Sequence, residues 1–344
     1  MSKALILIAP GLLALSAEKL AAMRSLATLA VYAGVPCFEP RGIAAALFAS
    51  LGVPEAVPIG PLASLGAGRD TGDDYVLCAD PVHLAVDRDT VVLVQTVDDL
   101  SASDADALIQ MLNRHFAEDD LRFEAARPDA WFVRRRQPAD IVTTPPDVAR
   151  GRKLLASMPR GTDGGKWKRW QNEIEMLLHE HAINSIREAR GEAVVSGVWF
   201  WGGGRLGDVG ALPVAAVTAS PGRLGDLARG IARQGHGVAT PMQAGDDLTQ
   251  AVTRADAVGT EDRDLPIAVL VVLPPITEPA ATFESYWMEP ALDQLARRRV
   301  DPFHLIADGH GATVTWTARP PGYRQRITAR MMRRPFEVPA LPDA

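Results

Sequence analysis

The residues best suited to chemistry lie between positions 163 and 211, where four of the seven tryptophans and two histidines precede three consecutive glycines. His181 and Asn184 continue the apolar stripe of a predicted helix, and Arg187 lies at the edge of that stripe. An imidazole, an amide and a guanidinium in this arrangement can hold a ligand. They can equally be paired core groups that join the helix to the next strand, and both interpretations remain open.

Three glycines, Gly202, Gly203 and Gly204, follow a predicted strand in which Trp199 and Trp201 face one side. A loop without Cβ atoms allows close approach to the backbone, and its amides, with a nearby arginine, can hold a phosphate or carboxylate. We therefore expect an anion-binding site at these glycines, with Arg187 or Arg205 nearby. The alternative is that the glycines only let the loop pass close beneath a neighbouring helix.

Asp80 and His83, in the run ADPVHL, form a second candidate pair. A carboxylate beside an imidazole can bind a cation or transfer a proton, and strand ends are where α/β folds place ligand contacts. Asp308 and His310 form a similar pair, which ordinary hairpin chemistry explains better than a functional role does.

The helix that must position His181, Asn184 and Arg187 is predicted to run without interruption from residue 163 to residue 190. Thr162 or Asp163 can cap it, and Gly191 can end it in the left-handed conformation. Elsewhere, a first strand feeds a first helix, and the continuously apolar run at 266–275 is typical of a central parallel strand. A hairpin is predicted to turn on Asp308-Gly309.

Strands that alternate with helices predict an α/β sandwich with a mostly parallel central sheet. We expect one domain over residues 1–344, with a smaller inserted subdomain around 75–150 as a variant of that arrangement. The length of 344 residues and the hydrophobic content of 47% are sufficient for a sizeable core.

Charge and cysteine content narrow the class of protein. With 36 basic and 42 acidic residues, the net charge of -6 disfavours nucleic acid as a partner. Cys37 and Cys78 lack a metal-binding spacing, are predicted to be buried, and suit a reducing compartment. The apolar N-terminal run is interrupted at Pro10-Gly11, which favours a strand over a signal peptide, and no apolar stretch reaches roughly 18 residues. We expect a cytoplasmic protein without a membrane partner.

The runs LLHEHAINSIREARG at 177–191 and SGVWFWGGG at 196–204 carry a resemblance to known proteins. They resemble RpfE-type bacterial regulatory proteins, described as phosphoglycerate mutase-like, and the archaeal-type cofactor-independent phosphoglycerate mutases of the alkaline-phosphatase superfamily. Fainter likeness extends to 75–89 and 227–237. The resemblance implies an alkaline-phosphatase-like three-layer sandwich. The matching positions are His181, Asn184, Arg187, Trp199, Trp201 and Gly202.

The resemblance also implies two metal ions beside a Ser or Thr nucleophile, with one metal-binding Asp at the end of the first strand. This chain has Ile8-Ala9-Pro10-Gly11 there, and only Glu278 and Glu284 where a late Asp and His are expected. We therefore expect no metal and no cofactor, and a degenerate, non-catalytic protein with a regulatory or ligand-binding role. The alternative is a phosphomutase or phosphatase acting on phosphorylated three-carbon acids through a rearranged site. The expected partners are a small anionic ligand, phosphorylated or carboxylated, and another protein.

Overall fold

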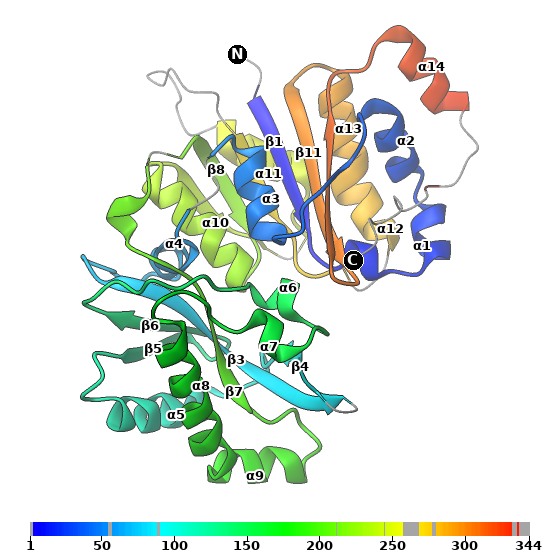
Figure 1. The fold of residues 1–344 in the computed structure, drawn as a ribbon. Coiled ribbons are helices and arrows are strands. Elements are labelled where there is room, and N and C mark those ends of the chain that lie inside the picture. The colour runs from blue at the N-terminus through cyan, green and yellow to red at the C-terminus, as the bar shows by residue number, and fades with distance from the viewer. Residues whose placement is uncertain are drawn as a thin grey trace. The chain divides into compact units, whose positions relative to one another are not determined.

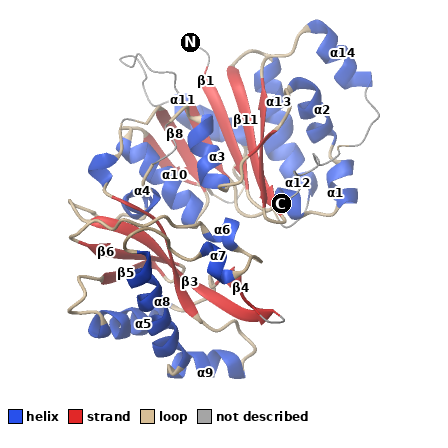
Figure 2. Ribbon diagram, in the orientation of Figure 1, coloured by secondary structure: helices blue, strands red, loops and turns tan. Residues whose placement is uncertain are grey.

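The structure is a computed structural model that describes residues 3–53, 57–87, 90–210, 212–243, 245–256, 268–276, 280–331 and 336. The chain forms two compact units, which are traced in Figure 1. Unit 1 comprises Met1–Glu55 and Ala211–Ala344, and unit 2 comprises Ala56–Gly210. Each unit is built on its own sheet, as Figure 2 shows. The single domain expected from the sequence stays a prediction; the inserted unit extends beyond 75–150 at both ends.

The sheet of unit 1 is mixed. Its strands, in spatial order, are β2 (Cys37–Phe38), β12 (Ala312–Ala318), β11 (Val300–Gly309), β1 (Lys3–Ala9), β10 (Ala268–Val272), β8 (Val214–Ala219) and β9 (Val238–Pro241). The five strands from β11 to β9 pair in parallel, whereas β12 and β2 pair antiparallel. The mostly parallel sheet expected from the sequence is therefore found only in part. β10 is fully buried between β1 and β8, as its apolar run predicts.

Helices cover both faces of this sheet (Figure 1). They are α1 (Ala17–Ala22), α2 (Arg24–Tyr32), α3 (Ile43–Ser50), α10 (Arg223–Gln234), α11 (Leu248–Asp256), α12 (Ala280–Phe283), α13 (Glu289–Ala296) and α14 (Tyr323–Met331), with the short turns η1 (Leu12–Ala14) and η3 (Glu284–Met288). Residues of α2, α11 and α13 form one hydrophobic core with Leu5 and Leu7 of β1. Helices α3 and α10 pack on the opposite face, so unit 1 has three layers.

The hairpin between β11 and β12 turns two residues later than predicted. Asp308 and Gly309 are paired with β12, and the turn is made by His310 (φ 50°) and Gly311 (φ 76°). A Cβ on Gly309 would overlap the backbone of Leu13 and Ala14. Close packing therefore requires the glycine of Asp308-Gly309, and the positive φ angles fall on the next two residues. Cys37 is also exposed, against expectation, whereas Cys78 is buried.

Unit 2 is built on a five-stranded antiparallel sheet. Its strands are β3 (Tyr75–Asp87), β4 (Thr90–Thr96), β5 (Arg122–Arg127), β6 (Ala130–Arg135) and β7 (Gly197–Gly204). β3 pairs with β6 and then β4 along one edge, and with β7 along the other. The length of β3 therefore makes it the organising strand of this unit.

The helices of unit 2 are α4 (Ile59–Gly66), α5 (Ala102–His115), α6 (Pro146–Ala149), α7 (Leu154–Ser157), α8 (Gly164–His179) and α9 (Ala182–Ala189), followed by the turn η2 (Leu206–Asp208). α5 and α8 form the core with one face of the sheet, through Trp167 and Ile174 of α8 and Val198 and Phe200 of β7. Trp199 and Trp201 alternate with that face, as predicted from the strand period.

Candidate functional site

The prediction of one continuous helix over 163–190 is wrong, because the helix is interrupted between α8 and α9. His181 has extended backbone angles (φ -78°, ψ 132°), and its Nδ1 accepts a hydrogen bond from the amide of Ile183 at 3.3 Å. It is thus the N-cap of α9, since a side-chain acceptor at this position satisfies a free amide of the first turn. Asp163, the expected cap of α8, instead accepts from the amide of Asp140 at 2.8 Å. Gly191 follows α9 with φ 71°, as predicted.

Asn184 is buried and connects three backbone groups. Its amide nitrogen donates to the carbonyls of Leu178 at 2.7 Å and Val195 at 2.8 Å, and its Oδ1 accepts from the amide of Val195 at 2.8 Å. The side chain therefore joins the end of α8 to the segment that enters β7. These bonds agree with the interpretation of Asn184 as a paired core residue.

Arg187 is 3% exposed and has partners within unit 2. Its guanidinium contacts the carboxylate of Asp99, lies 3.3 Å from that of Glu192, and donates to the carbonyl of Ala193 at 2.8 Å. Two carboxylates beside this guanidinium neutralise its charge, so Arg187 is poorly placed to attract an anion.

Asp80 and His83 are not brought together, because residues three apart on a strand point to opposite faces. Both lie within β3 rather than at a strand end. Asp80 is buried and accepts from the indole nitrogen of Trp201 at 2.6 Å. His83 Nδ1 lies 3.0 Å from the carbonyl of Val194 and 3.4 Å from the hydroxyl of Ser196. The carboxylate–imidazole pair expected from the sequence does not form.

The three glycines lie inside β7 rather than in a loop. Cys78 pairs with Trp201 and Val76 with Gly204, so β7 contains one extra residue and bulges at Gly202, where φ is 66°. The amide of Gly202 donates to the hydroxyl of Thr143 at 3.1 Å.

Neighbouring side chains occupy the space that the missing Cβ atoms leave. A Cβ on Gly202 would lie 2.8 Å from that of Ile59, one on Gly203 would overlap the ring of Tyr75, and one on Gly204 would overlap Pro58. Trp199, the other expected ligand contact, donates from its indole nitrogen to the carbonyl of Thr144 at 2.8 Å. Binding of an anion by these residues stays a prediction, and their packing gives it no support.

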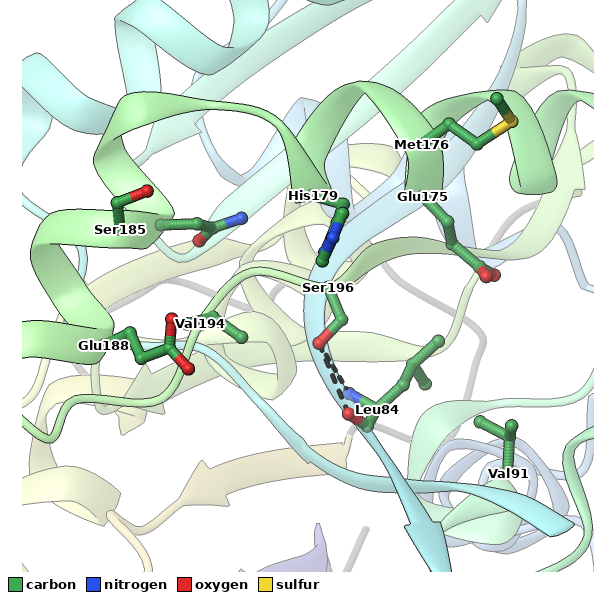
Figure 3. Close-up of a pocket in the computed structure, with 10 residues that line it drawn as sticks. Leu84, Val91, Glu175, Met176, His179, Ser185, Glu188, Val194 and Ser196 are labelled. Carbon is green, nitrogen blue, oxygen red and sulfur yellow. Dashed lines mark hydrogen bonds between the residues drawn. The ribbon is translucent and has the colours of Figure 1, made fainter.

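A groove of about 500 Å³ lies on unit 2 between the polar side of α8, helix α9 and the β3–β4 pair (Figure 3). We call it the unit 2 groove. Its lining residues are Leu84, Val91, Glu175, Met176, His179, Asn184, Ser185, Glu188, Val194 and Ser196. A second depression, which shares Glu188 and Val194 and adds His83 and Glu192, continues from it. Of the residues predicted from the sequence, Asn184 and His83 thus line this surface.

Four apolar side chains and two carboxyl groups, Glu175 and Glu188, line the unit 2 groove together with polar side chains. Burial raises the pKa of Glu175, because the charged form loses solvation. The hydroxyl of Ser196 accepts from the amide of Leu84 at 3.1 Å and fixes one wall (Figure 3). The helical period places Glu175 and His179 outside the apolar stripe of α8. No local signal indicated that the β3–β4 pair would extend along that side.

The carboxyl ends of the parallel strands β1, β8, β10 and β11 meet at one edge of the unit 1 sheet. At this edge the amide of Gly11 donates to the carboxylate of Asp308 at 2.6 Å. Glu284, one of the two late glutamates, accepts from the amide of Ser25 at 2.6 Å, and Glu278 lies outside the described residues. Within the described part of the chain, no group of three or more His, Cys, Asp or Glu side chains is arranged to hold a metal ion.

His304 of β11 is a buried imidazole in unit 1. Its Nδ1 lies 2.9 Å from the hydroxyl of Thr317. Burial, with a smaller contribution from the positive charge of Arg319, lowers the pKa of His304 from 6.5 to about 4. The ring is therefore neutral in the folded protein at physiological pH, and its position inside the sheet gives it a structural role.

No family model and no curated protein matches the chain. Among solved structures, the chain is similar to a cofactor-independent phosphoglycerate mutase from Thermoplasma acidophilum DSM 1728, with 15% identity, a TM-score of 0.45, and coverage of 93% of this chain and 90% of that one. It is also similar to the PH0037 protein from Pyrococcus horikoshii, with 15% identity, a TM-score of 0.48, and coverage of 94% and 89%. At this identity and TM-score, neither likeness says anything about activity or site residues. Among the described residues, no helix is both long and apolar enough to cross a bilayer.

Proposed function

We propose that this chain is a non-catalytic, phosphoglycerate mutase-like protein that acts by binding, in a regulatory or ligand-binding role. The observation that carries the proposal is the end of β1. Ala9, Pro10 and Gly11 stand where the resembling enzymes have a metal-binding Asp, and the nearby Asp308 carboxylate accepts from the amide of Gly11. A hydroxyl nucleophile without a metal or a base is too weak for phosphoryl transfer.

The partners of the motif residues give these residues a structural role in unit 2. Asn184 and Arg187 bond to backbone carbonyls and carboxylates of their own unit. The unit 2 groove, which residues of the resembling segment line in part, has room for a ligand. Its carboxylates favour a ligand with an amine or other hydrogen-bond donors over the small anion that the sequence suggests.

The test is an assay of phosphoryl transfer. The purified chain is supplied with Mn²⁺, Zn²⁺ or Mg²⁺ and assayed for interconversion of 2- and 3-phosphoglycerate and for phosphate release from each. We expect no turnover above that of a heat-denatured sample. Turnover that is lost in Asp308→Asn, together with two equivalents of Mn or Zn per washed chain, would establish the alternative, an enzyme with a rearranged site.

A thermal-shift screen addresses the binding role. It compares phosphate, 3-phosphoglycerate and phosphoenolpyruvate with putrescine and agmatine, using wild type, Glu188→Gln and Arg187→Met. Stabilisation by an amine that is weakened in Glu188→Gln is the expected result. Stabilisation by a phosphorylated acid that is lost in Arg187→Met would restore the anion-binding interpretation.

A further inference from the structure

Helix α14 (Tyr323–Met331) packs against α2 along one side (Figure 1). The amide nitrogen of Gln325 donates to the carbonyl of Val31 in α2 at 3.3 Å, and Ala329, one turn further, is half-buried. Residues 325 and 329 therefore mark the side of α14 that faces the body of unit 1.

The opposite side of α14 presents apolar side chains to solvent. Tyr323, Ile327 and Met331 are 80%, 40% and 74% exposed. They recur every four residues and are centred about 180° around the helix from Gln325 and Ala329, at 100° per residue. We call these three side chains the α14 row. Burial of large apolar side chains is favourable, so a row that points directly away from the core favours a partner.

Arginines lie on α14 beside the row and at the end of α13. Arg324 is exposed next to it, and Arg326 donates to the carbonyl of Ala296 at 2.6 Å, which brings the end of α13 close to α14. Arg298 and Arg299, which follow α13, are exposed as well. Two further arginines nearby are paired, Arg297 with Asp293 at 2.9 Å and Arg319 with Asp301 at 3.6 Å.

The sequence has no Asp or Glu from residue 309 to residue 336, although the whole chain carries a net charge of -6. A positive surface on a negative protein selects an anionic partner. The exposed apolar row lies beside exposed arginines, a combination that suits a bilayer interface. There, apolar side chains enter the acyl boundary while arginines contact lipid phosphates. Nucleic acid is a poorer match, because Ile327 and Met331 would be pressed against a charged backbone.

We propose that the α14 row and its arginines form a docking surface for an anionic phospholipid bilayer. The composition of the chain led us to expect no membrane partner, because no segment is long enough to span one. A surface that docks on the interface needs no spanning segment, and the exposed α14 row beside exposed arginines offers it apolar and cationic contacts.

The test is co-sedimentation of the full chain with vesicles of phosphatidylcholine and phosphatidylserine in about a 2:1 ratio, against phosphatidylcholine alone. The variants are Arg324→Glu and the double change Ile327→Ser with Met331→Ser. The matched controls are Arg152→Glu, an exposed arginine of unit 2, and Val35→Ser, an apolar side chain of unit 1 that is 97% exposed.

We expect binding to the anionic vesicles only, weakened by salt. Because each arginine near such a surface contributes about 1 kcal/mol, charge reversal at Arg324 should lower partitioning about tenfold or more. The double serine variant should lower it several-fold, with both controls and all unfolding midpoints unchanged. Equal binding to both vesicle types, or anionic binding that neither variant weakens, overturns the proposal. Retention on heparin without vesicle binding also overturns it, in favour of a soluble polyanion.

Discussion

Asn184 provides the sharpest test of how the α8–α9–β7 region is held together. Replacing it with Ala removes three hydrogen bonds, two to Val195 and one to the carbonyl of Leu178. The Leu178 carbonyl still accepts from the amide of His181 at 3.1 Å, so the loss falls mainly on Val195, which is fully buried.

The magnitude follows from those contacts. Each hydrogen bond contributes a net stabilisation of about 0.5–1.5 kcal/mol. The variant also leaves two backbone groups of Val195 buried without their side-chain partner. Together, these losses predict a destabilisation of about 2–4 kcal/mol. Asn184→Asp should cost at least as much near neutral pH. It keeps an acceptor for the Val195 amide, but it places a carboxylate oxygen against two carbonyl oxygens.

The assay is urea unfolding followed by tryptophan fluorescence. Most tryptophans report on unit 2, namely Trp131, Trp167, Trp170, Trp199 and Trp201, and two transitions are fitted because the compact units can unfold separately. Ser185→Ala, an exposed neighbour on α9, is the matched control and should stay within about 0.5 kcal/mol of wild type. A similarly small effect of Asn184→Ala would refute the reasoning. A Kd change without a stability change would assign Asn184 to ligand binding instead.

Three other predictions concern stability. Arg187→Met should lower the free energy of unfolding of unit 2 by about 1–3 kcal/mol. The lower end of this range applies if solvent screens its partly exposed acidic partners. A variant as stable as wild type in urea would contradict the structural role. Gly204→Ala should cost about 1–3 kcal/mol, because its Cβ would overlap Pro58, whereas Gly165→Ala, with open space around it inside α8, should gain about 0.5–1 kcal/mol. The folded-state pKa of His304 is lowered to about 4, so its contribution to stability is complete above pH 6.5 and is lost as the pH falls through 4. That contribution is at most about 3 kcal/mol, and thermal unfolding between pH 7 and pH 4 should depend less on pH in His304→Gln.

The strands with continuous apolar runs were predictable from sequence because burial on both faces leaves a pattern that no other element shares. β10 lies centrally in its sheet for this reason. The break at His181 was not predictable. The stretch from Leu178 to Asn184 contains no Gly or Pro, and histidine is not among the usual N-cap residues.

The candidate site was harder to predict than the fold because its outcome depends on distant partners. In the sequence, the glycines of β7 fit an anion-binding site and close packing equally well. What distinguishes the two is their contact with Pro58 and Tyr75, which lie more than a hundred residues earlier. Likewise, Asp80 and His83 look like a pair only if strand alternation is ignored. The unit 2 groove depends on the relative positions of β3, β4, α8 and α9, which no single stretch of sequence encodes.

The motif that carries the family resemblance has a structural function in this chain. Asn184 and Arg187 tie α9 to residues 193–195, the segment that leads into β7, and Trp201 is bonded to Asp80 of β3. These bonds hold a helix and a strand together, and they are not themselves part of phosphate transfer. The presence of the motif therefore indicates the arrangement of unit 2 and does not separate an enzyme from a binding protein. The proposed function rests instead on the end of β1, where Ala9-Pro10-Gly11 offers no carboxylate, and the metal and turnover assays are its test.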